Sequence, residues 1–249
     1  KNMRLMAGKP LIQYAIQTAL SCEAVDVVAV STDSDEIASF ARQFDGVLIV
    51  NRDSELAKDA VTLDPVIYDA VIRCENRLCC HFDVVVTMQP TSPLLTCETL
   101  SGALSYFDEE PVDSLISVVN SPHLSWAKGS EGNVIPEYKK RLNRQQLPPR
   151  YIETGAFLIA NRNSITPDSR LGSRIGVFET PEHEATDIDT REDWVVCEAL
   201  LSRKKIAFRV DGYPQLGMGH VYRALTLAYS LVNHDIVFIC NKACKEGIE

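Results

Sequence analysis

The sequence predicts an α/β fold with a doubly wound, mostly parallel sheet. Short runs of β-branched residues alternate with amphipathic segments along most of the chain. Several of these runs are apolar at every position, as are strands buried on both faces of a parallel sheet. With 249 residues, 45% of them hydrophobic, the chain can also bury a sizeable core. Together these observations favour a globular α/β protein.

The elements follow in a regular order. The expected strands of the first domain are 25–32, 46–51, 83–88, 114–120, 155–160 and 175–179. The expected helices are 11–21, 33–44, 62–77, 96–107 and 191–203. Pro10 suits a first helical turn, and Asp35 and Glu36 place negative charge near the start of their helix. The last helix closes a first domain, residues 1–203.

A polar stretch, residues 121–150, interrupts this pattern. It is longer than an ordinary connection between secondary-structure elements. A lid, a dimerisation arm and a simple surface excursion are all compatible with its composition.

The pattern restarts after Lys204, with an expected strand 206–211, a glycine-rich loop 212–219, a helix 220–231 and a strand 235–240. This single β-α-β unit offers too little surface for independent stability, so we expect residues 205–249 to be the N-terminal fragment of a second domain. The chain starts at Lys1 rather than at a methionine. We therefore expect it to be cut at both ends.

Charge and composition exclude several classes of function. The net charge of −9 and the pI near 5.1 argue against nucleic acid or an anionic membrane as the main partner. No apolar run is long enough to span a bilayer, and no signal peptide opens the chain, so a cytoplasmic location is expected. The eight cysteines form no CxxC pair, which predicts reduced thiols.

Ligands of open parallel sheets bind beyond the carboxyl ends of the strands, and polar clusters follow two of the expected strands. Thr32 and Asp33 could contact a ribose or could cap the next helix. Residues 89–94 place Gln89, Thr91 and Ser92 in a loop stiffened by two prolines, which is either a ligand-binding loop or a rigid turn.

Two further clusters are charged. In a strand, Asp187 and Asp189 would share one face, and two carboxylates suit Mg²⁺; alternatively, Asp189 and Thr190 cap the helix that follows. Lys1, Arg52 and Arg144 are cations that either bind an anion or are solvated at the surface. Arg52 lies at the ligand-binding end of the sheet.

No nucleophile with an adjacent base is visible, and no two histidines have the spacing of metal ligands. Hydroxyls, an amide, cations and paired carboxylates suit phosphoryl or nucleotidyl transfer, in which positioning and charge neutralisation supply most of the catalysis.

An ordered set of motifs over residues 1–203 resembles the CMP-sialic acid synthetases, also called acylneuraminate cytidylyltransferases. Each motif alone is modest, but the ordered set is specific. The motifs are Lys1-Asn2, 7–12, 31–33, 55–59, 89–94, 144–148, 155–156 and 187–190.

The resemblance implies a nucleotide-diphospho-sugar transferase-like, Rossmann-like fold and transfer of CMP from CTP to a sialic-type nonulosonic acid, with Mg²⁺. It implies a homodimer through the 121–150 arm, whose Arg144 and Gln145 reach the partner's sugar pocket. Asp187 and Asp189 take the metal position, and Gln89 and Thr154 contact the sugar. The residues implied for the nucleotide are Lys1, Asn2, Thr32, Asp33, Arg52, Asp59, Thr62, Thr91 and Ser92. Lys1, Gln89, Asp187 and Asp189 are the expected catalytic group.

Leu95, Ile152, Thr154 and Leu158 stand where the family commonly has other residues. Legionaminate and pseudaminate are therefore as plausible as N-acetylneuraminate. The rival functions are a cytidylyltransferase for 3-deoxy-octulosonate and a non-catalytic nucleotide-binding or scaffold module. The resemblance also implies that the first strand of the sheet and the phosphate loop of the family would precede Lys1. We therefore expect residues 1–249 alone, with that strand and loop missing, to be poorly active.

Residues 205–249 resemble the start of the UDP-sugar hydrolase of pseudaminate synthesis and its glycosyltransferase-like relatives. The resemblance lies in 209–211 and in 217–223, and it implies roles for Gly217, Gly219 and the catalytic His220. The alternative is a glycine-rich turn followed by an incidental histidine.

Overall fold

The computed structural model describes residues 1–130, 132–212 and 218–241. The chain divides into two compact units, residues 1–193 and 194–249. The division falls near the start of the last helix of the first predicted domain, whereas the sequence predicts a boundary after residue 203.

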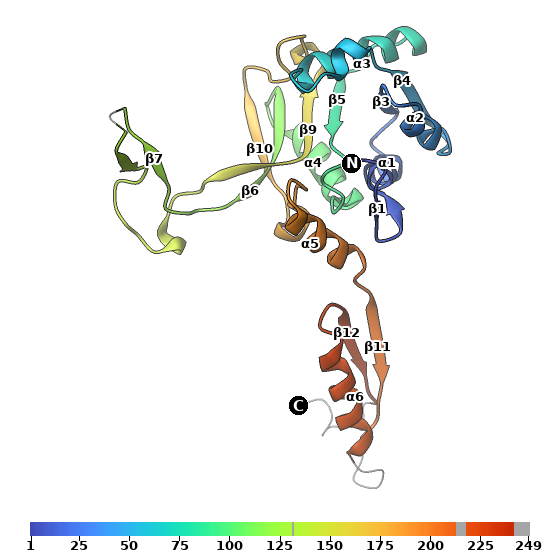
Figure 1. Cartoon of the computed structure of the whole chain (residues 1–249), viewed down its shortest axis with the longest axis vertical. Helices are drawn as coiled ribbons and strands as arrows, with labels where there is room; N and C mark the ends of the chain where they lie inside the picture. The colour runs from blue at the N-terminus through green and yellow to red at the C-terminus, as the bar shows by residue number, and fades with distance from the viewer. Residues whose placement is uncertain (131, 213–217, 242–249) are drawn as a thin grey trace. The chain divides into compact units, whose positions relative to one another are not determined.

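The first unit contains a four-stranded sheet in the order β10-β6-β9-β5 and a two-stranded sheet of β3 and β4 (Figure 1). Their bounds are β3 Val28–Thr32, β4 Val47–Asn51, β5 Val84–Met88, β6 Ser114–Asn120, β9 Tyr151–Asn161 and β10 Ile175–Glu179. The β3–β4 and β6–β10 pairs are parallel. Every predicted strand of this unit is present, so the α/β architecture predicted from the sequence is confirmed.

Strand β9 is the exception to the parallel arrangement, because it runs antiparallel to both β5 and β6. It begins at Tyr151, earlier than the predicted residue 155, and Tyr151 pairs with Asn120 at the end of β6. The chain leaves β6 and returns along it without a crossover helix, and such a return produces an antiparallel neighbour.

The intervening residues 121–150 form an arm (Figure 1). It consists of an antiparallel hairpin, β7 Trp126–Lys128 with β8 Val134–Pro136, and a 3₁₀ turn, η2 Arg144–Gln146. Trp126 packs edge-on against Tyr138, with ring centroids 5.6 Å apart, yet its side chain remains half exposed. The hairpin is a feature that the polar composition did not predict.

The helices agree closely with the sequence analysis. They are α1 Leu11–Ser21, α2 Asp35–Ala41, α3 Leu63–Leu78, α4 Cys97–Glu109 and α5 Arg191–Leu201. The prediction that a helix begins at Asp33 is wrong, because the Ser34 hydroxyl caps α2 by accepting from the Ile37 amide at 3.4 Å. The short 3₁₀ turns are η1 Ser54–Ala57, η3 Arg162–Ser164 and η4 Glu182–Glu184.

An unpredicted hairpin precedes α1, formed by β1 Leu5–Met6 and β2 Lys9–Pro10. Its two turn residues, Ala7 and Gly8, have φ angles of 47° and 84°. Positive φ at both central positions matches the twist of a tight hairpin.

The main core of this unit lies between α4 and the face of β6 and β9 that it covers. Leu100, Ala103 and Phe107 of α4 pack with Leu115 of β6 and Ile159 of β9. Burial of this face holds the two strands at a set position, so the end of β5 and the part of β9 around Gly155 are well placed to carry a site.

A buried ion pair joins α3 to the end of β9. Arg162 donates to Glu75 from Nε at 2.8 Å and from Nη2 at 2.9 Å, and both side chains are about one-tenth exposed. His81 Nδ1 lies 2.9 Å from the same carboxylate. The hydrogen bond from Arg162 lowers the pKa of Glu75.

Glu75→Gln is expected to lower the free energy of unfolding by about 2 kcal/mol near neutral pH, because the two-point charged contact is lost. Since the pKa of Glu75 is lowered in the folded state, the stabilisation is complete above its ordinary value and disappears as the pH falls through the lowered value. Urea unfolding of both proteins across the acid range measures this. The exposed Glu23→Gln is the control, and a difference that does not shrink in acid would contradict the expectation.

The second unit contains all but the first turn of α5, followed by β11 Lys205–Arg209, α6 Gly219–Ser230 and β12 Asp235–Ile239. The two strands pair in parallel, from Lys205 with Asp235 to Arg209 with Ile239. This is the β-α-β unit that the sequence predicts. Gly217 of the expected glycine loop lies outside the described residues.

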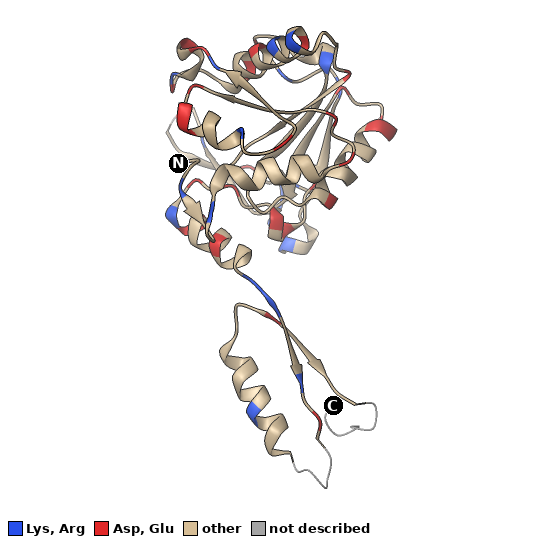
Figure 2. Ribbon diagram, turned by 90° about the vertical axis from the view of Figure 1, so that its right-hand side faces the viewer, with Lys and Arg blue, Asp and Glu red and all other residues tan. Residues whose placement is uncertain are grey.

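Figure 2 shows acidic and basic residues interspersed along the ribbon of the described chain. Among the described residues, no helix combines the length and hydropathy needed to cross a membrane. None of the seven described cysteines forms a disulfide, and Cys244 lies outside the described residues.

Candidate active site

Three distant parts of the chain meet at the carboxyl end of β5. The Ile188 amide donates to the Thr91 carbonyl at 2.9 Å, which ties residues 187–189 to the loop after β5. Lys1 Nζ donates to the Ile188 carbonyl. Lys1, Gln89, Thr91 and the two predicted carboxylates are therefore gathered at one place, as expected for the ends of neighbouring strands.

Gly155 makes room for two of these side chains. It lies in an irregular part of the β6–β9 pairing and has a φ of +67°. A Cβ atom at this position would lie 2.9 Å from Asp187 Oδ2 and 3.4 Å from Gln89 Nε2. Asp187 and Gln89 thus approach the same point, and only a residue without a side chain permits this approach.

Asp187 has an unsatisfied oxygen. Its Oδ1 atom is buried and has no hydrogen-bond partner among the described residues. A buried carboxylate oxygen without a partner is costly, so such an atom commonly marks the position of an absent cation or ligand. Asp189, two residues on, is exposed.

The prediction that Asp187 and Asp189 lie in a strand is wrong. Residues 185–189 belong to no helix or strand, and the bond from Ile188 to Thr91 is a single loop contact. An apolar residue between two aspartates has the alternating pattern typical of a strand. Here the alternation arises in a loop, in which Ile188 is buried, Asp187 is half-buried and Asp189 is exposed.

Of the two residues predicted as an alternative helix cap, Thr190 caps α5 and the Asp189 side chain does not. The Thr190 hydroxyl accepts from the Asp193 amide at 3.2 Å, and Asp193 Oδ2 accepts from the Thr190 hydroxyl and amide at 2.7 Å. These bonds, led by that from the Thr190 hydroxyl, lower the pKa of Asp193. The reciprocal capping box starts α5 and leaves the carboxylates of Asp187 and Asp189 available to a ligand.

The donor set fits a hard divalent cation. Two carboxylates with hard oxygen atoms suit Mg²⁺, which leaves its other positions to water and phosphate oxygens. Within the described ranges, no group of three or more histidine, cysteine, aspartate or glutamate side chains could hold a metal by protein ligands alone.

Ser92 and Thr154 lie beneath this site rather than at its surface. Both are buried, and the Ser92 hydroxyl donates to the Thr154 carbonyl at 3.3 Å. The Thr154 hydroxyl donates to Ser117 Oγ at 2.9 Å. Their side chains fix the loop after β5 to β9, so in this structure they position other residues.

Arg52 lies at the ends of the neighbouring strands β3 and β4. Its Nη2 donates to the Ser31 carbonyl at 2.7 Å, and its amide donates to the Thr32 carbonyl at 2.9 Å. Thr32 is buried, and its hydroxyl accepts from the Ser34 amide at 3.1 Å. The predicted cap thus moves to Ser34, and Asp33 remains exposed.

The remaining predicted residues lie at the surface. Asp59 and Thr62 are exposed between β4 and α3, and Asn2 accepts from the Ile12 amide through its backbone carbonyl at 3.0 Å. Arg144 and Gln145 are exposed in the arm, and no hydrogen bond within the described chain joins them to Gln89 or Asp187. In the second unit, Gly219 and His220 are exposed at the start of α6.

A pocket beside Gln89 contains a cation that the sequence analysis missed. Arg170 comes from the loop before β10, where no periodicity or motif marks it. Asp193 was also missed, although a threonine followed three residues later by an acidic residue is a readable capping pattern. The residues lining the pocket are Thr87, Gln89, Ile116, Ser117, Glu153, Gly155, Phe157, Leu158 and Arg170.

Residues 1–190 match the family model described as cytidylyltransferase. The flagellin modification protein B of Campylobacter coli is 28% identical over 83% of this chain and 90% of its own length. CMP-N,N'-diacetyllegionaminic acid synthase of Legionella pneumophila is 32% identical over 81% of this chain and 89% of its own length. N-acylneuraminate cytidylyltransferase A of Danio rerio is 30% identical over 82% of this chain and 47% of its own length, so this chain spans about half of that protein.

Among solved structures, 4-diphosphocytidyl-2C-methyl-D-erythritol synthase superposes with a TM-score of 0.61 at 15% identity, covering 81% of this chain and 94% of that one. At this identity the similarity shows the fold alone. It agrees with the Rossmann-like α/β class predicted from the sequence.

Proposed function

The chain belongs to the cytidylyltransferase family, and from this premise we propose that it joins CTP to a nonulosonic acid, releasing pyrophosphate and forming the CMP-sugar. The relatives at 28 to 32% identity include proteins named for acylneuraminate and legionaminate. The observation that most supports the proposal is the meeting of Lys1, Gln89 and Asp187 at the end of β5.

Asp187 and Asp189 would hold the divalent cation, which we propose to be Mg²⁺. When bound, the cation neutralises charge that develops on the phosphates. The unpartnered Oδ1 of Asp187 supports this role. The Lys1 ammonium, bound to the carbonyl between the two aspartates, is a second positive charge for the pyrophosphate leaving group.

Gln89 would orient the sugar beside these charges. Its amide approaches Asp187 and also lines the adjoining pocket. Because transfer depends on holding the attacking hydroxyl in line with the α-phosphate, this positioning is a large part of the catalysis. Thr154 and Ser92 would act by fixing the loop rather than by direct contact.

The cytidine side of the site would be formed by the ends of β3 and β4. Arg52 is held by Ser31 and can direct its remaining N–H groups to a nucleotide. The other residues that we propose for the nucleotide are Asn2, Thr32, Asp33, Asp59, Thr62 and Thr91.

We also propose a homodimer through the arm. Trp126, Val134 and Ile135 expose 44 to 62% of their surface on the β7–β8 hairpin. Exposed apolar groups on a projecting hairpin favour burial against a second copy, which would bring Arg144 and Gln145 to the partner's pocket. Sedimentation of the protein and a Trp126→Lys, Ile135→Lys variant tests this, and a wild-type monomer would refute it. The role of residues 205–249 as a sugar-nucleotide hydrolase-like domain stays a prediction.

The test of the activity is pyrophosphate release by the full-length protein with CTP and Mg²⁺. The sugar panel is N-acetylneuraminate, N,N'-diacetyllegionaminate, a pseudaminate and 3-deoxy-octulosonate. We expect release with at least one of the first three. Release with 3-deoxy-octulosonate alone would favour the rival substrate, and CTP binding without release from any sugar would favour the non-catalytic module.

A further inference from the structure

The loop between β9 and β10 is organised around Arg170. The Thr166 hydroxyl accepts from the Asp168 and Ser169 amides at 3.3 and 3.1 Å, which closes a turn. The fully buried Ser114 of β6 donates to the Arg170 carbonyl at 3.4 Å. Ser114 Oγ also accepts from the Gly172 amide at 2.9 Å, so the backbone that carries Arg170 is fixed to the first residue of β6.

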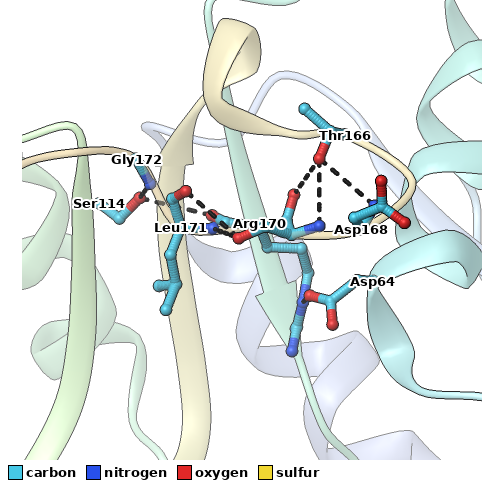
Figure 3. A network of polar contacts seen from close by, with 8 residues as sticks. Asp64, Ser114, Thr166, Asp168, Arg170, Leu171 and Gly172 are labelled. Atoms are coloured by element: carbon cyan, nitrogen blue, oxygen red, sulfur yellow. Dashed lines mark hydrogen bonds and ion pairs between the residues drawn. The ribbon is translucent and has the colours of Figure 1, made fainter.

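The guanidinium of Arg170 is held by α3. Figure 3 shows the side chain extending from the loop to Asp64, and Nε donates to Asp64 Oδ1 at 2.9 Å. The Arg170 side chain is only 16% exposed and that of Asp64 26%. No partner within the described chain occupies the two terminal nitrogens of Arg170, so these donors remain available in a sheltered position.

These donors belong to the pocket that begins at Gln89. Gly155 lies between this pocket and Asp187, since it lines the pocket and has Asp187 and Gln89 as its near neighbours. Ile116 and Leu158, which pair across β6 and β9, supply apolar side chains beside the polar groups. The pocket that begins at Gln89, beside Asp187, therefore also reaches Arg170.

Charge indicates the chemistry of the group that Arg170 would bind. Asp64 compensates its positive charge, and Glu153 lines the same pocket. An anionic ligand group bound by Arg170 would be repelled by the carboxylates of Asp64 and Glu153. A neutral acceptor avoids this repulsion and can still accept hydrogen bonds from the free N–H groups of Arg170. An acylamino substituent fits best, because its carbonyl accepts from an arginine and its methyl group packs on apolar side chains.

We propose that Arg170, oriented by Asp64, determines specificity by binding the acylamino group of the sugar. The inference rests on the proposed function and adds a residue to its sugar pocket. Arg170 acts on the substrate end remote from the phosphates, so it contributes to sugar binding and not to phosphate chemistry.

The test compares an N-acylated nonulosonic acid with the same sugar carrying a free amine, using full-length protein. We expect Arg170→Gln to raise the KM for the acylated sugar about tenfold. The KM for CTP and the kcat at saturating sugar should change less than twofold, and the preference for the acylated sugar should fall at least fivefold. Arg170→Lys is the second variant, for the case in which Arg170→Gln folds poorly. It keeps the positive charge near Asp64 but loses the planar guanidinium, so it should also raise the KM for the acylated sugar and lower the preference for it.

Arg174→Gln is the matched control, since it breaks an exposed ion pair with Asp113 in the same loop but does not line the pocket. If Arg170→Gln lowered kcat/KM equally for the acylated sugar and for the free amine, Arg170 would only support the fold. If the KM for the acylated sugar were unchanged, Arg170 would not bind the sugar. Either result would overturn the inference while leaving the proposed function intact. Absence of turnover with every sugar by the wild-type protein would instead refute the proposed function itself.

Discussion

Asp187→Asn is expected to lower the rate of pyrophosphate release about 1000-fold. The substitution keeps the size of the side chain but removes the negative charge that would hold the cation beside the phosphates. Because Asp187 Oδ1 is buried without a partner, the free energy of unfolding should stay constant or increase. Large loss of activity without loss of stability is the signature of a group retained for ligand binding.

Two measurements test this expectation. Initial rates with CTP and the preferred sugar give the loss of turnover, and Mn²⁺ titration in the presence of CTP should show at least a tenfold weaker affinity. Asp45→Asn, which makes the same chemical change at an exposed residue before β4, should alter neither by more than twofold. Turnover and Mn²⁺ affinity within twofold of wild type would remove Asp187 from the metal role.

Gly155→Ala should have the second largest effect, about a 100-fold loss of kcat/KM. The new Cβ would lie 2.9 Å from Asp187 Oδ2, so that carboxylate must move away from its present position. The φ of +67° adds a backbone penalty of about 1 to 2 kcal/mol in the free energy of unfolding. Activity and stability should therefore fall together.

Gly46→Ala separates the two causes. Gly46 also has a positive φ, +84°, but its nearest neighbour to a new Cβ is Leu20 at 3.9 Å. In urea unfolding, Gly46→Ala should lose about as much free energy of unfolding as Gly155→Ala, and it should keep the kcat/KM of the wild type. If both variants lost activity equally, backbone strain and not the displacement of Asp187 would explain the result.

The order of elements was predictable because its signals are local. Runs of β-branched residues marked β3 to β6 and β10 to within a few residues, and proline and acidic residues marked helix starts. The antiparallel direction of β9 was not predictable from the same signals. A strand has the same periodicity whichever way it runs, and the direction depends on the path of the arm.

The candidate site was predictable in its residue types and not in its geometry. Asp187 and Asp189 were assigned equivalent positions, but one has a buried, unpartnered oxygen and the other is exposed. Ser92 and Thr154 were assigned to ligands, and the structure places their hydroxyls in buried hydrogen bonds. Burial depends on what packs over a residue, which sequence spacing does not specify.

The sequence by itself determined the α/β class, the order of the main strands and helices and the family, because periodicity, capping residues and ordered motifs are encoded over short stretches. Only the tertiary structure decided that Gly155 leaves room for Asp187 and that Arg170 faces the pocket of Gln89. The contact of Arg170 with Asp64 joins residues 106 positions apart. Such a contact forms only when the packed sheet brings the loop before β10 to the start of α3, and no local pattern encodes it.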